Sequence, residues 1–465
     1  MGKKSIKEVC NIIWGIEDEY DLFNKKINDV FFWKITRYHT FNLIANELSL
    51  FNKKNETKKE KITYKIFYLF KKIKNYYLHG AIRRNNNKEI LLFESPRKKK
   101  IDGEYIDIYT HQFTNKFKGS NYELIEEDYH KKHYNEPSNL RSYNDYFSLR
   151  NFLKYKLFSI NFNNEEKEFL KKIKEEIEQT FDIKLKKYNN SVKKIIGNFL
   201  YKYKYYDKLL KKRKPNKVYL VCSYGSEALI KACKDNGIRS IEIQHGTISQ
   251  YHLGYSFPNN QEIPYFPEQI NMFGKYWYES TPIPLEKENI KFIGYPFMED
   301  RINKFCNSIN KNNQVLFISQ PTITVRLAKI AYEFALNNQN YNVIYKLHPA
   351  EYKSWEDIYP WLSKGKTLNN FSVVDSDEKD LYELFSESEY LVGVYSTAVY
   401  EGLVLNCKTV LIDLPGIDYM EYLIENEFVK LASNSVELSN KINEGNFTSI
   451  KKDYFFKNIT SKGLV

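Results

Sequence analysis

Three short segments of this sequence contain the residue types that bind phosphate or move a proton. They read Gln244-His245-Gly246-Thr247, Lys346-Leu347-His348-Pro349 and Tyr395-Ser396-Thr397. Each follows an apolar run that predicts a buried strand. An imidazole at a strand end can accept or donate a proton near neutral pH. Hydroxyls that begin a helix favour a phosphate, because the first backbone N–H groups of the helix are free there and its dipole attracts negative charge.

Further candidate residues lie in or directly after predicted loops of the same kind. Their side chains carry hydroxyl, amide, carboxyl or imidazole groups, and they are Glu227, His252, Ser319, Gln320, Thr322 and Glu401. A single histidine near a strand end is more often a structural hydrogen-bonding group than a catalyst. Three of the eight histidines fall in these loops, however, and this combination favours a functional site. Gly246 would let the backbone turn closely, and Pro349 would end the pairing of its strand.

The elements that would position these loops alternate in type from about residue 215 onwards. Apolar runs such as 218–222, 342–347 and 390–394 are separated by helical stretches. Strands rich in β-branched residues that alternate with helices predict βαβ units and therefore parallel sheets. We expect an α/β fold, with two doubly wound Rossmann-type domains that face a cleft and the polar segment 295–313 as the hinge. Ligands of such sheets bind at the carboxyl ends of the strands, where the three segments lie.

We place the boundary between the domains near residue 300, so that they span 1–300 and 301–465. Within the first domain, residues 215–300 would form the Rossmann-like βαβ part, and residues 1–214 an extended basic region of irregular pattern.

Some elements are nevertheless predicted inside that basic region. Apolar or alternating runs predict strands over 90–94 and 105–109, which the basic segment 97–103 would join as a hairpin. Residues 164–213 are strongly charged and predict helices.

Length and composition bound the class of protein. A chain of 465 residues with 42% hydrophobic residues is too long for one ordinary core and suits two domains. An aromatic share of 16% excludes a disordered chain. The sequence has no apolar run long enough for a membrane span and none near its start, so we expect a cytoplasmic protein. The five cysteines lack metal-ligand spacing and the three segments contain no Asp-x-Asp pair, so we expect no cofactor and no essential metal.

The net charge of +13 is unevenly distributed along the chain. Residues 1–214 contain 47 basic and 28 acidic side chains, whereas residues 215–465 contain 24 and 30. Basic clusters lie at 53–61, 97–100 and 211–214. Any one cluster is equally well explained as solvated surface, but the regional excess predicts a polyanionic partner, such as nucleic acid, anionic lipid headgroups or an acidic polymer. No zinc-finger, helix-turn-helix or RNP-like pattern is present, so we expect no nucleic acid.

The order of the segments resembles that of two-domain bacterial glycosyltransferases of the GT-B type, in particular enzymes of capsule and lipopolysaccharide assembly. Ile293-Gly294-Tyr295-Pro296 and the pattern Ser-Thr-x-x-x-Glu-Gly that begins at Ser396 belong to the same series, which covers about residues 215–415. The His-Pro and paired hydroxyl elements look like those of transferases that use CMP-sugars. His-Gly, His-Pro and Ser-Ser elements also occur in the teichoic acid polymerases, which use CDP-alcohols, and the segments here are similar to them.

The resemblance implies a role for each candidate residue. The C-terminal domain would bind a nucleotide-sugar donor through His348, Pro349, Ser396, Thr397, Glu401, Ser319, Gln320 and Thr322. The N-terminal domain would hold the acceptor, and the acceptor-side residues would be Gln244, Gly246, Thr247 and His252. An inverting transfer needs a base for the acceptor hydroxyl and charge relief for the leaving phosphate. His245 is our candidate base and Glu227 is its rival; CMP-sugar enzymes generally use a carboxylate, so both remain open.

We therefore expect a glycosyltransferase that moves a sugar, with a CMP-sugar favoured as donor, to a surface polysaccharide or a lipid-linked glycan. The acceptor would be anionic, and the basic region would contact it or the inner face of the cytoplasmic membrane. Two alternatives are a CDP-alcohol phosphotransferase of the teichoic acid type and a sugar-nucleotide 2-epimerase, which shares the architecture. Epimerases are compact, whereas this chain has about 200 further residues in front. A basic nucleic-acid-binding protein is the alternative that is not an enzyme.

Overall fold

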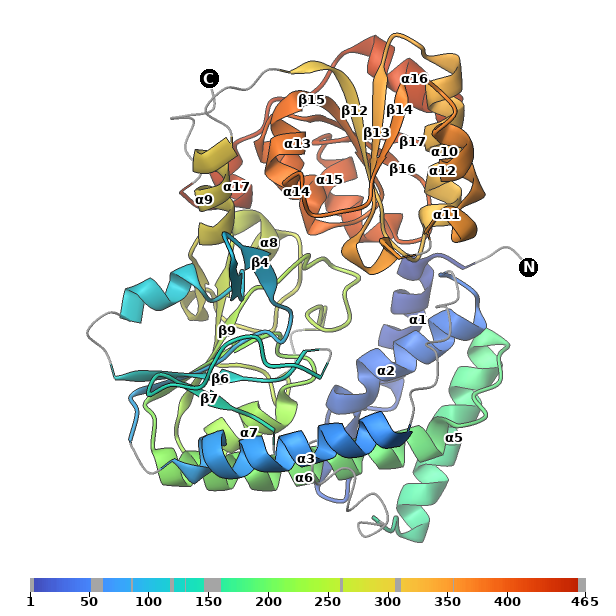
Figure 1. Cartoon of the computed structure of the whole chain (residues 1–465). Helices are drawn as coiled ribbons and strands as arrows, with labels where there is room; N and C mark the ends of the chain where they lie inside the picture. Colours follow the sequence, from blue (N-terminus) through green and yellow to red (C-terminus); the bar gives the residue numbers. More distant parts are fainter. Residues whose placement is uncertain are drawn as a thin grey trace.

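Two α/β domains lie one above the other in the computed structural model, with the first domain at the bottom of Figure 1 and the second at the top. Each domain is built on one parallel sheet with helices packed against it. The structure describes the whole chain except residues 1–3, 52–61, 85–86, 118–120, 130, 146–159, 260–261, 306–310, 354 and 459–465.

The first domain contains a seven-stranded parallel sheet with the order β7-β6-β3-β8-β9-β10-β11. The winding direction reverses between β3 and β8, because the chain first builds outwards on one side of β3 and then on the other. Such a reversal opens a crevice at the carboxyl ends of the two strands. The strands are Ile90–Phe93 (β3), Tyr122–Glu126 (β6), Arg141–Tyr143 (β7), Lys217–Val221 (β8), Arg239–Ile243 (β9), Gln269–Met272 (β10) and Ile290–Phe292 (β11).

The second domain repeats this topology in a six-stranded parallel sheet with the order β14-β13-β12-β15-β16-β17. Here the winding direction reverses between β12 and β15. Both sheets are therefore doubly wound, and the expected architecture of two Rossmann-type domains facing a cleft is confirmed. The strands are Asn312–Ile318 (β12), Asn342–Lys346 (β13), Phe371–Val374 (β14), Ser388–Gly393 (β15), Lys408–Ile412 (β16) and Lys430–Ala432 (β17).

Capping residues in the sequence mark several helix ends. Ser5 and Glu8 form a capping box at the start of α1, and Asn163 and Glu166 form another at the start of α5. Gly445 ends α16 in the left-handed conformation, with φ +74°. The helices are Ile6–Glu19 (α1), Phe32–Glu47 (α2), Ile62–His79 (α3), Asn164–Phe181 (α5), Tyr188–Arg213 (α6), Glu227–Asp235 (α7), Lys275–Glu279 (α8), Pro296–Phe305 (α9), Thr324–Asn337 (α10), Trp355–Ile358 (α11), Pro360–Gly365 (α12), Leu381–Glu387 (α13), Thr397–Val404 (α14), Glu421–Glu425 (α15), Ser435–Glu444 (α16) and Lys452–Phe455 (α17).

Short elements complete the fold. Two antiparallel pairs lie outside the main sheets: Lys26–Ile27 (β1) with Val30–Phe31 (β2), and Lys99–Ile101 (β4) with Glu104–Ile106 (β5). The 3-10 turns are Ala81–Arg83 (η1), Gln112–Phe117 (η2), Lys287–Asn289 (η3), Pro349–Glu351 (η4) and Ile417–Met420 (η5).

Residues 1–214 are a structural part of the first domain, which corrects the expectation of an irregular extension. They supply β3, β6 and β7, three of the seven strands of the sheet. The expected hairpin is also corrected: the strand at residue 90 joins the main sheet, and the hairpin is formed by β4 and β5. Sequence patterns did not reveal β6 because it contains two buried carboxylates, of Glu123 and Glu126.

Two crossings connect the domains. Helix α9 leads from the first domain to the second and occupies much of the segment that we expected to be a hinge. Near the end of the described chain, α17 returns to the first domain, where Trp277 Nε1 donates to the carbonyl oxygen of Phe455 at 2.7 Å. Since the Phe455 ring also lies 6.1 Å from that of Tyr400 in α14, α17 packs against both domains, and the boundary near residue 300 stays a prediction.

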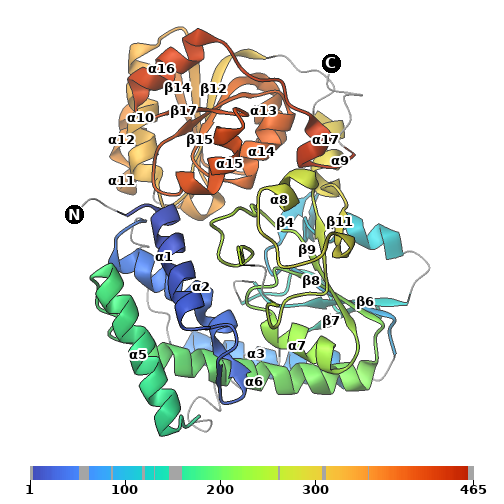
Figure 2. The same ribbon diagram turned by 180° about the vertical axis from the view of Figure 1, so that it is seen from behind.

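The domains pack together on both sides of the cleft. On one side, the ring of Trp277 lies 4.4 Å from that of Tyr400 in α14, and Tyr276 Oη lies 3.2 Å from Tyr400 Oη. On the other side, the N-terminal helix α1 lies beneath the second domain (Figure 2), where Ile6 N donates to Asp418 Oδ2 at 3.0 Å. These contacts hold the two sheets in a fixed relation.

Candidate functional site

Both sheets present the carboxyl ends of their strands to the cleft. The loop that contains Gly246 and Thr247 follows β9, and Thr397 begins α14 after β15. Thr247 Oγ1 lies 3.4 Å from Thr397 Oγ1 across the cleft. A Cβ atom on Gly246 would lie 3.5 Å from the same oxygen, so these loops are in contact distance. The structure thus brings together two of the three segments that the sequence singled out.

His245 lies at the cleft with both ring nitrogens near tyrosine hydroxyls. Its Nε2 is 3.3 Å from Tyr224 Oη and its Nδ1 is 3.4 Å from Tyr255 Oη. The edge of Tyr109 lies against the same ring, with 6.2 Å between the ring centres. Burial, together with the smaller effects of the charges of His252 and Arg97, lowers the pKa of His245 to about 3. The imidazole is therefore neutral at physiological pH.

The neighbours of His245 determine which of its nitrogens can accept a proton. Tyr255 donates its hydroxyl hydrogen to the buried carboxylate of Glu242. The Tyr255 oxygen can then only accept, so Nδ1 of His245 carries the ring hydrogen and donates it. Nε2 then carries the lone pair of the ring, and this lone pair accepts the hydroxyl hydrogen of Tyr224. This arrangement gives His245 the tautomer that a general base requires.

His252 lies behind His245 in an aromatic cluster rather than at a polar surface. Its ring stacks on Tyr38 with 5.6 Å between the centres and 11° between the planes, and its Nδ1 accepts from Gly254 N at 3.2 Å. Burial lowers the pKa of His252 to about 4. These contacts give His252 a role in packing that sequence analysis did not foresee.

Glu227 and His245, the two candidate bases, lie in different places. Glu227 begins α7, accepts from Gly225 N at 2.9 Å and lies 3.6 Å from Lys34 Nζ. It lines a pocket of about 390 Å³ between α2, α6 and the β8–α7 loop. Tyr224 also lines this pocket, and its hydroxyl contacts His245. Of the two candidate bases, His245 lies in the loop whose Thr247 contacts Thr397 of the second domain.

The side chain of Gln244 supports the backbone of its own loop. Its side chain is fully buried, its Nε2 donates to the carbonyl oxygen of Gly246 at 2.8 Å, and its Oε1 accepts from Phe273 N at 2.8 Å. Each end of the amide makes one hydrogen bond within the protein, so Gln244 supports this loop, and its acceptor-side role stays a prediction.

In the second domain, Glu351 organises the loops after β12 and β13. Its carboxylate accepts from Ser319 Oγ at 2.7 Å, from the Thr324 hydroxyl and from His348 N at 3.0 Å. Ser319 is buried, and Tyr345 Oη also contacts its hydroxyl. This hydroxyl therefore links the loops after β12 and β13, and the expected donor contact through Ser319 stays a prediction.

The ring of His348 is exposed at the cleft and is oriented by its own backbone. Nδ1 accepts from Ala350 N at 3.1 Å, at the start of the 3-10 turn that Pro349 begins. Nε2 therefore carries the hydrogen and can donate it to an oxyanion. Partial burial lowers the pKa of His348. The negative charge of Glu351 opposes this shift, and the positive charges of Arg97 and Lys346 add to it.

Polar groups line the reversal point of the second sheet. Ser396 Oγ caps α14 by accepting from Ala398 N at 3.2 Å, and Val399 N donates to the Ser396 carbonyl oxygen at 3.1 Å, so that of the first three N–H groups of α14 only that of Thr397 has no partner among the described residues. Thr322 Oγ1, after β12, lies 2.6 Å from Tyr395 Oη, after β15. Gln320 Oε1 has no hydrogen-bond partner among the described residues. A phosphate at this point would find N–H and hydroxyl donors from both strands.

Glu401 lies one helical turn beyond Thr397 on α14 and is 8% exposed. Its carboxyl group accepts from the hydroxyl of Tyr382. Burial raises the pKa of Glu401 to about 7, while the hydrogen bond from Tyr382 and the charge of Lys99 oppose the shift. The second domain thus contains a buried carboxyl group on α14 whose pKa lies near neutral pH.

Sequence analysis left several site features unassigned. Asp375 and Asp377 form an Asp-x-Asp pair after β14, but they accept hydrogen bonds from Trp355 Nε1 at 2.8 Å and Tyr352 Oη at 2.7 Å. Within the described ranges, no three His, Cys, Asp or Glu side chains gather where they could hold a metal ion. The expectation that no metal is essential stays a prediction. The Tyr255–Glu242 pair has no sequence signal, because it depends on a contact between a loop and a strand.

Comparisons with known proteins give structural matches but no sequence match. No protein-family model matches the chain, and no curated protein matches it. Solved structures match with TM-scores of 0.45 for a UDP-GlcNAc 2-epimerase from Methanocaldococcus jannaschii, 0.40 for a wall teichoic acid polymerase and 0.40 for a glycosyltransferase from Rickettsia africae.

The matched regions are long and the sequence identities are low. The epimerase is 11% identical and the match covers 79% of this chain and 95% of that one. The polymerase is 14% identical, with 87% and 92% covered, and the Rickettsia enzyme is 12% identical, with 77% and 88% covered. We therefore derive the function from the geometry of the cleft.

Proposed function

We propose that the protein is a glycosyltransferase that moves a sugar from a nucleotide-sugar donor to a glycan acceptor with inversion. The observation that supports this proposal is that two loops with different chemical groups face each other across one cleft. His245, with a proton-accepting Nε2, lies on the first domain. The first turn of α14 and the ring Nε2–H of His348 lie on the second domain. Thr247 Oγ1 and Thr397 Oγ1, 3.4 Å apart, are where the two sides meet.

The chemistry follows from this arrangement. The acceptor hydroxyl would displace Tyr224 at Nε2 of His245 and give its proton to that nitrogen as its oxygen attacks the anomeric carbon. The bond from the anomeric carbon to the phosphate oxygen breaks, and its electron pair leaves with the phosphate. The N–H of Thr397 at the start of α14 and Nε2–H of His348 would stabilise the charge that develops there. Attack and departure on opposite sides of the carbon invert its configuration.

Finer features of the function remain part of the proposal. We propose a CMP-sugar as the favoured donor and an anionic acceptor, either a surface polysaccharide of the capsule or lipopolysaccharide kind or a lipid-linked glycan. The donor phosphate would be held by N–H groups and cations, so no metal is needed. Glu401 would lie near the ribose, since it follows the phosphate-binding turn by one helical turn.

We also propose that α3 contacts an anionic membrane surface. No helix within the described ranges is long and apolar enough to cross a membrane. On α3, however, Phe67, Phe70, Tyr77 and Leu78 are between 58% and 68% exposed and lie on one face at helical spacing.

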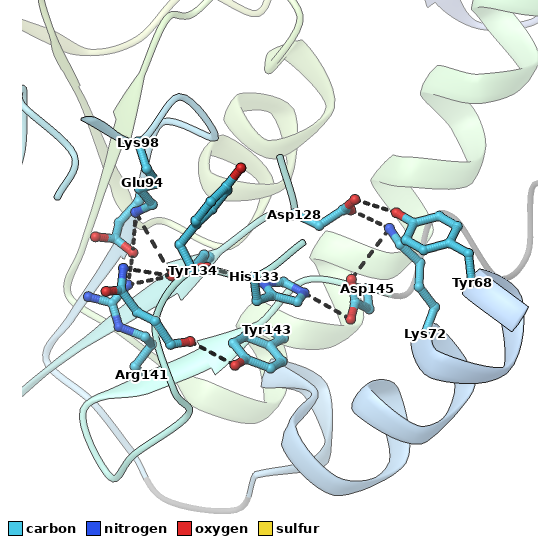
Figure 3. A network of polar contacts seen from close by, with 12 residues as sticks. Tyr68, Lys72, Glu94, Lys98, Asp128, His133, Tyr134, Arg141, Tyr143 and Asp145 are labelled. Carbon is cyan, nitrogen blue, oxygen red and sulfur yellow. Dashed lines mark hydrogen bonds and ion pairs between the residues drawn. The ribbon is translucent and has the colours of Figure 1, made fainter. Parts of the chain in front are cut away.

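The opposite face of α3 is the polar one, and it is turned into the protein. There Tyr68 donates to Asp128 and Lys72 pairs with Asp128 and Asp145, as Figure 3 shows. The exposed Lys71 and Lys74 lie between the outer apolar residues. A helix with large apolar and basic side chains on its outer face fits the surface of an anionic bilayer.

Two variants test the proposed function. The wild-type protein is first titrated with CMP, CDP, UDP and GDP and the corresponding sugars, with thermal unfolding as the readout; a true ligand raises stability by RT ln(1+[L]/Kd). We expect His348→Ala to weaken binding of that nucleotide by tenfold or more. We expect His245→Ala to keep the affinity and to lower transfer by about a hundredfold.

Each alternative function gives a different result in the same experiments. If no nucleotide stabilises the wild type, the proposed function is wrong. Conversion of the sugar nucleotide without an acceptor indicates an epimerase, and transfer of a polyol phosphate from a CDP-alcohol indicates the phosphotransferase. A larger loss of turnover in Glu227→Ala than in His245→Ala would move the base to the pocket behind Tyr224.

A further inference from the structure

A pocket lies behind Tyr224 at the carboxyl end of β8, next to the point where the winding direction of the first sheet reverses. Its volume of about 390 Å³ is within the range of small-molecule binding sites. One side of α2, one side of α6 and the loop from β8 to α7 form its wall, and we call it the α2–α6 pocket. In parallel sheets a ligand usually binds at such a reversal.

A carboxylate and an ammonium group lie together in the wall of the α2–α6 pocket. Glu227 Oε1 is 3.6 Å from Lys34 Nζ, and these side chains are 9% and 3% exposed. Gly225 N donates to Glu227 Oε2 at 2.9 Å and so orients the carboxylate. A separation of 3.6 Å is longer than a hydrogen bond, so both groups can still bond a third atom. A hydroxyl suits this pair, because it donates to a carboxylate and accepts from an ammonium group.

The buried cations of the wall are compensated within the protein. Arg37 also lines the pocket, and its Nε and Nη2 donate to the carboxylate of Glu17 at 2.6 and 2.9 Å. Its Nη1 donates to two backbone carbonyl oxygens. Lys34 faces Glu227, so a phosphate or carboxylate bound here would lie beside a like charge. The pocket is therefore suited to a neutral ligand rather than to an anion.

Other polar groups of the wall add to its hydrogen-bonding capacity. The amides of Asn42 on α2 and Asn198 on α6 line the pocket. His39 lines it as well, and its Nε2 is buried and has no hydrogen-bond partner among the described residues. Because buried polar atoms without a partner are few in proteins, this nitrogen indicates a contact that a bound molecule would complete.

The aromatic part of the wall leads to His245. Tyr38 and Tyr224 both line the pocket, with 5.1 Å between their ring centres. The hydroxyl of Tyr224 lies 3.3 Å from His245 Nε2, so one side chain separates the pocket from the candidate base. A wall of aromatic rings and hydroxyl-bonding groups suits a ligand that carries C–H and O–H groups together, as a sugar ring does.

The loop that carries Tyr224 has an uncommon backbone conformation. Cys222 has φ +73° and Gly225 has φ +98°. A positive φ is uncommon for a residue with a Cβ atom, and residues of this kind cluster at binding and active sites. A Cβ atom on Gly225 would meet no atom within 4 Å, in keeping with the open space of the pocket beside it. The loop thus holds Tyr224 between the pocket and His245.

We propose that the α2–α6 pocket binds an uncharged sugar ring of the glycan acceptor, through Glu227 and Lys34, and that the reacting hydroxyl of this sugar replaces the Tyr224 hydroxyl at His245 Nε2. The proposal rests on the proposed function and adds the pocket that selects the acceptor. Negative charges of the acceptor would lie on parts of the glycan outside this pocket. Glu227 then recognises the acceptor, whereas His245 takes its proton.

The test measures sugar binding directly. The probes are the methyl glycosides of glucose, galactose, mannose, N-acetylglucosamine and N-acetylgalactosamine, titrated by saturation-transfer difference NMR. The proteins are wild type, Asn198→Trp, which places an indole on the α6 side of the pocket, and the control Asn190→Trp, the same change at an exposed position of α6 outside the pocket. We expect a glycoside to bind wild type and control equally and Asn198→Trp at least tenfold more weakly, with nucleotide affinity unchanged in all three.

A second measurement links the pocket to the base. With histidine labelled by ¹⁵N, and His245 assigned through His245→Gln, we expect the bound glycoside to shift the Nε2 resonance of His245 as Tyr224 leaves it. If Asn198→Trp unfolds at a lower temperature than wild type, Glu227→Gln takes its place: it keeps the shape of the side chain but removes the charge, and we expect a several-fold loss of glycoside affinity.

The remaining outcomes separate this proposal from the proposed function. If no glycoside binds wild type, or if Asn198→Trp binds it equally well, the pocket is not a sugar site, and the function still stands where wild type binds a nucleotide. If a glycoside binds without any change at His245, the pocket does not present the acceptor to the base. If a glycoside binds but no nucleotide does, the proposed function fails, and the acceptor role of the pocket fails with it.

Discussion

His245 owes its chemical state to residues that are not next to it in the sequence. Tyr255, ten positions later, fixes the hydrogen on Nδ1 because its own hydroxyl is committed to Glu242. The sequence predicted the position of His245, since a residue that follows a parallel strand must lie at the carboxyl edge of the sheet. It did not predict the tautomer, since that depends on a loop folding back onto a strand.

The same distinction applies to the hydroxyl residues for which the sequence predicted a binding role. Ser319 and Thr322 both follow β12, and both are hydroxyl residues. The Ser319 hydroxyl is buried and donates to Glu351, whereas the Thr322 hydroxyl bonds to Tyr395 at the reversal point. Sequence spacing locates hydroxyls at a strand end, but only the structure shows which ones are already paired.

Glu401 gives a prediction on pH dependence. Its pKa is raised from 4.5 to about 7 in the folded protein, so the neutral form is favoured on folding. That contribution is complete below pH 4.5 and is lost as pH rises towards 7, where the buried group must ionise. Glu401→Gln keeps an acceptor for Tyr382 and cannot ionise. We therefore expect its stability relative to wild type to increase from pH 5 to pH 8, by up to the order of 3 kcal/mol.

Urea unfolding of the two proteins at four pH values measures this difference. The matched control is Glu425→Gln, which changes an exposed carboxylate of α15. A constant difference between Glu401→Gln and wild type from pH 5 to pH 8 would show that Glu401 does not titrate in this range.

At the scale of elements, patterns predicted the second sheet better than the first. Strands such as β12 and β15 are buried on both sides and read as continuous apolar runs, which is the signature of a central parallel strand. In β6, by contrast, Glu123 pairs with Arg213 of α6 and Glu126 pairs with Arg141. Charges compensated by a distant partner look like surface in a sequence, and so β6 was missed.

The buried charges around Glu126 form a network whose centre is His133 (Figure 3). His133 Nε2 lies 3.0 Å from Asp145 and Nδ1 lies 3.3 Å from Glu126, and its ring stacks on Tyr143 at 3.7 Å. Burial lowers the pKa of His133, but the hydrogen bonds and charges of the two carboxylates outweigh this effect and raise it. The imidazolium therefore holds β6 and the segment after β7 together.

Replacing His133 should destabilise the first domain in a pH-dependent way. A raised pKa means that the stabilisation is complete below the pKa of the unfolded state, near 6.5, and is lost as pH rises through the folded-state pKa. We expect His133→Gln to cost about 1.5–3 kcal/mol at pH 6, because Glu126 and Asp145 each lose a charge-assisted contact while keeping Arg141 and Lys72, and to cost less at pH 9. Urea unfolding measures both values, with the exposed His111→Gln as control. Equal losses at the two pH values would mean that His133 is neutral in the folded protein.

At the scale of the whole molecule, the uneven charge of the sequence separates into several parts. In the basic segment 97–100, Lys98 pairs with Glu94, and Lys99 lies 5.6 Å from the centre of the Phe297 ring in α9. In the cluster at 211–214, Arg213 is fully buried against Glu123, and Lys212 donates to the carbonyl oxygen of Ile82. The cluster at 53–61 lies outside the described residues. A regional excess of charge thus predicted an anionic partner without showing which cations face it.

The outer face of α3 is where the membrane proposal can be tested, because its apolar and basic residues act through different forces. Burial of Phe67 and Phe70 in a bilayer surface contributes a hydrophobic binding free energy that salt does not screen. Lys71 and Lys74 contribute an electrostatic binding free energy of about 1 kcal/mol each near an anionic surface, and salt screens this contribution. We expect wild type to co-sediment with vesicles that contain an anionic lipid at low salt. Phe67→Ser/Phe70→Ser should lower the partition coefficient by tenfold or more at any salt concentration, and Lys71→Gln/Lys74→Gln only at low salt.

The controls for this last experiment test whether something other than a membrane covers the outer face of α3. Val436→Ser removes a similarly exposed apolar side chain, 65% exposed on α16 of the second domain, and should bind vesicles as wild type does. Light scattering of wild type and of Phe67→Ser/Phe70→Ser reports the oligomeric state: a wild-type dimer that becomes monomeric in the variant would show that a second copy of the chain covers α3. If wild type ignores anionic vesicles at low salt and is monomeric, α3 does not dock on a membrane, and the anionic acceptor must be sought at the cleft alone.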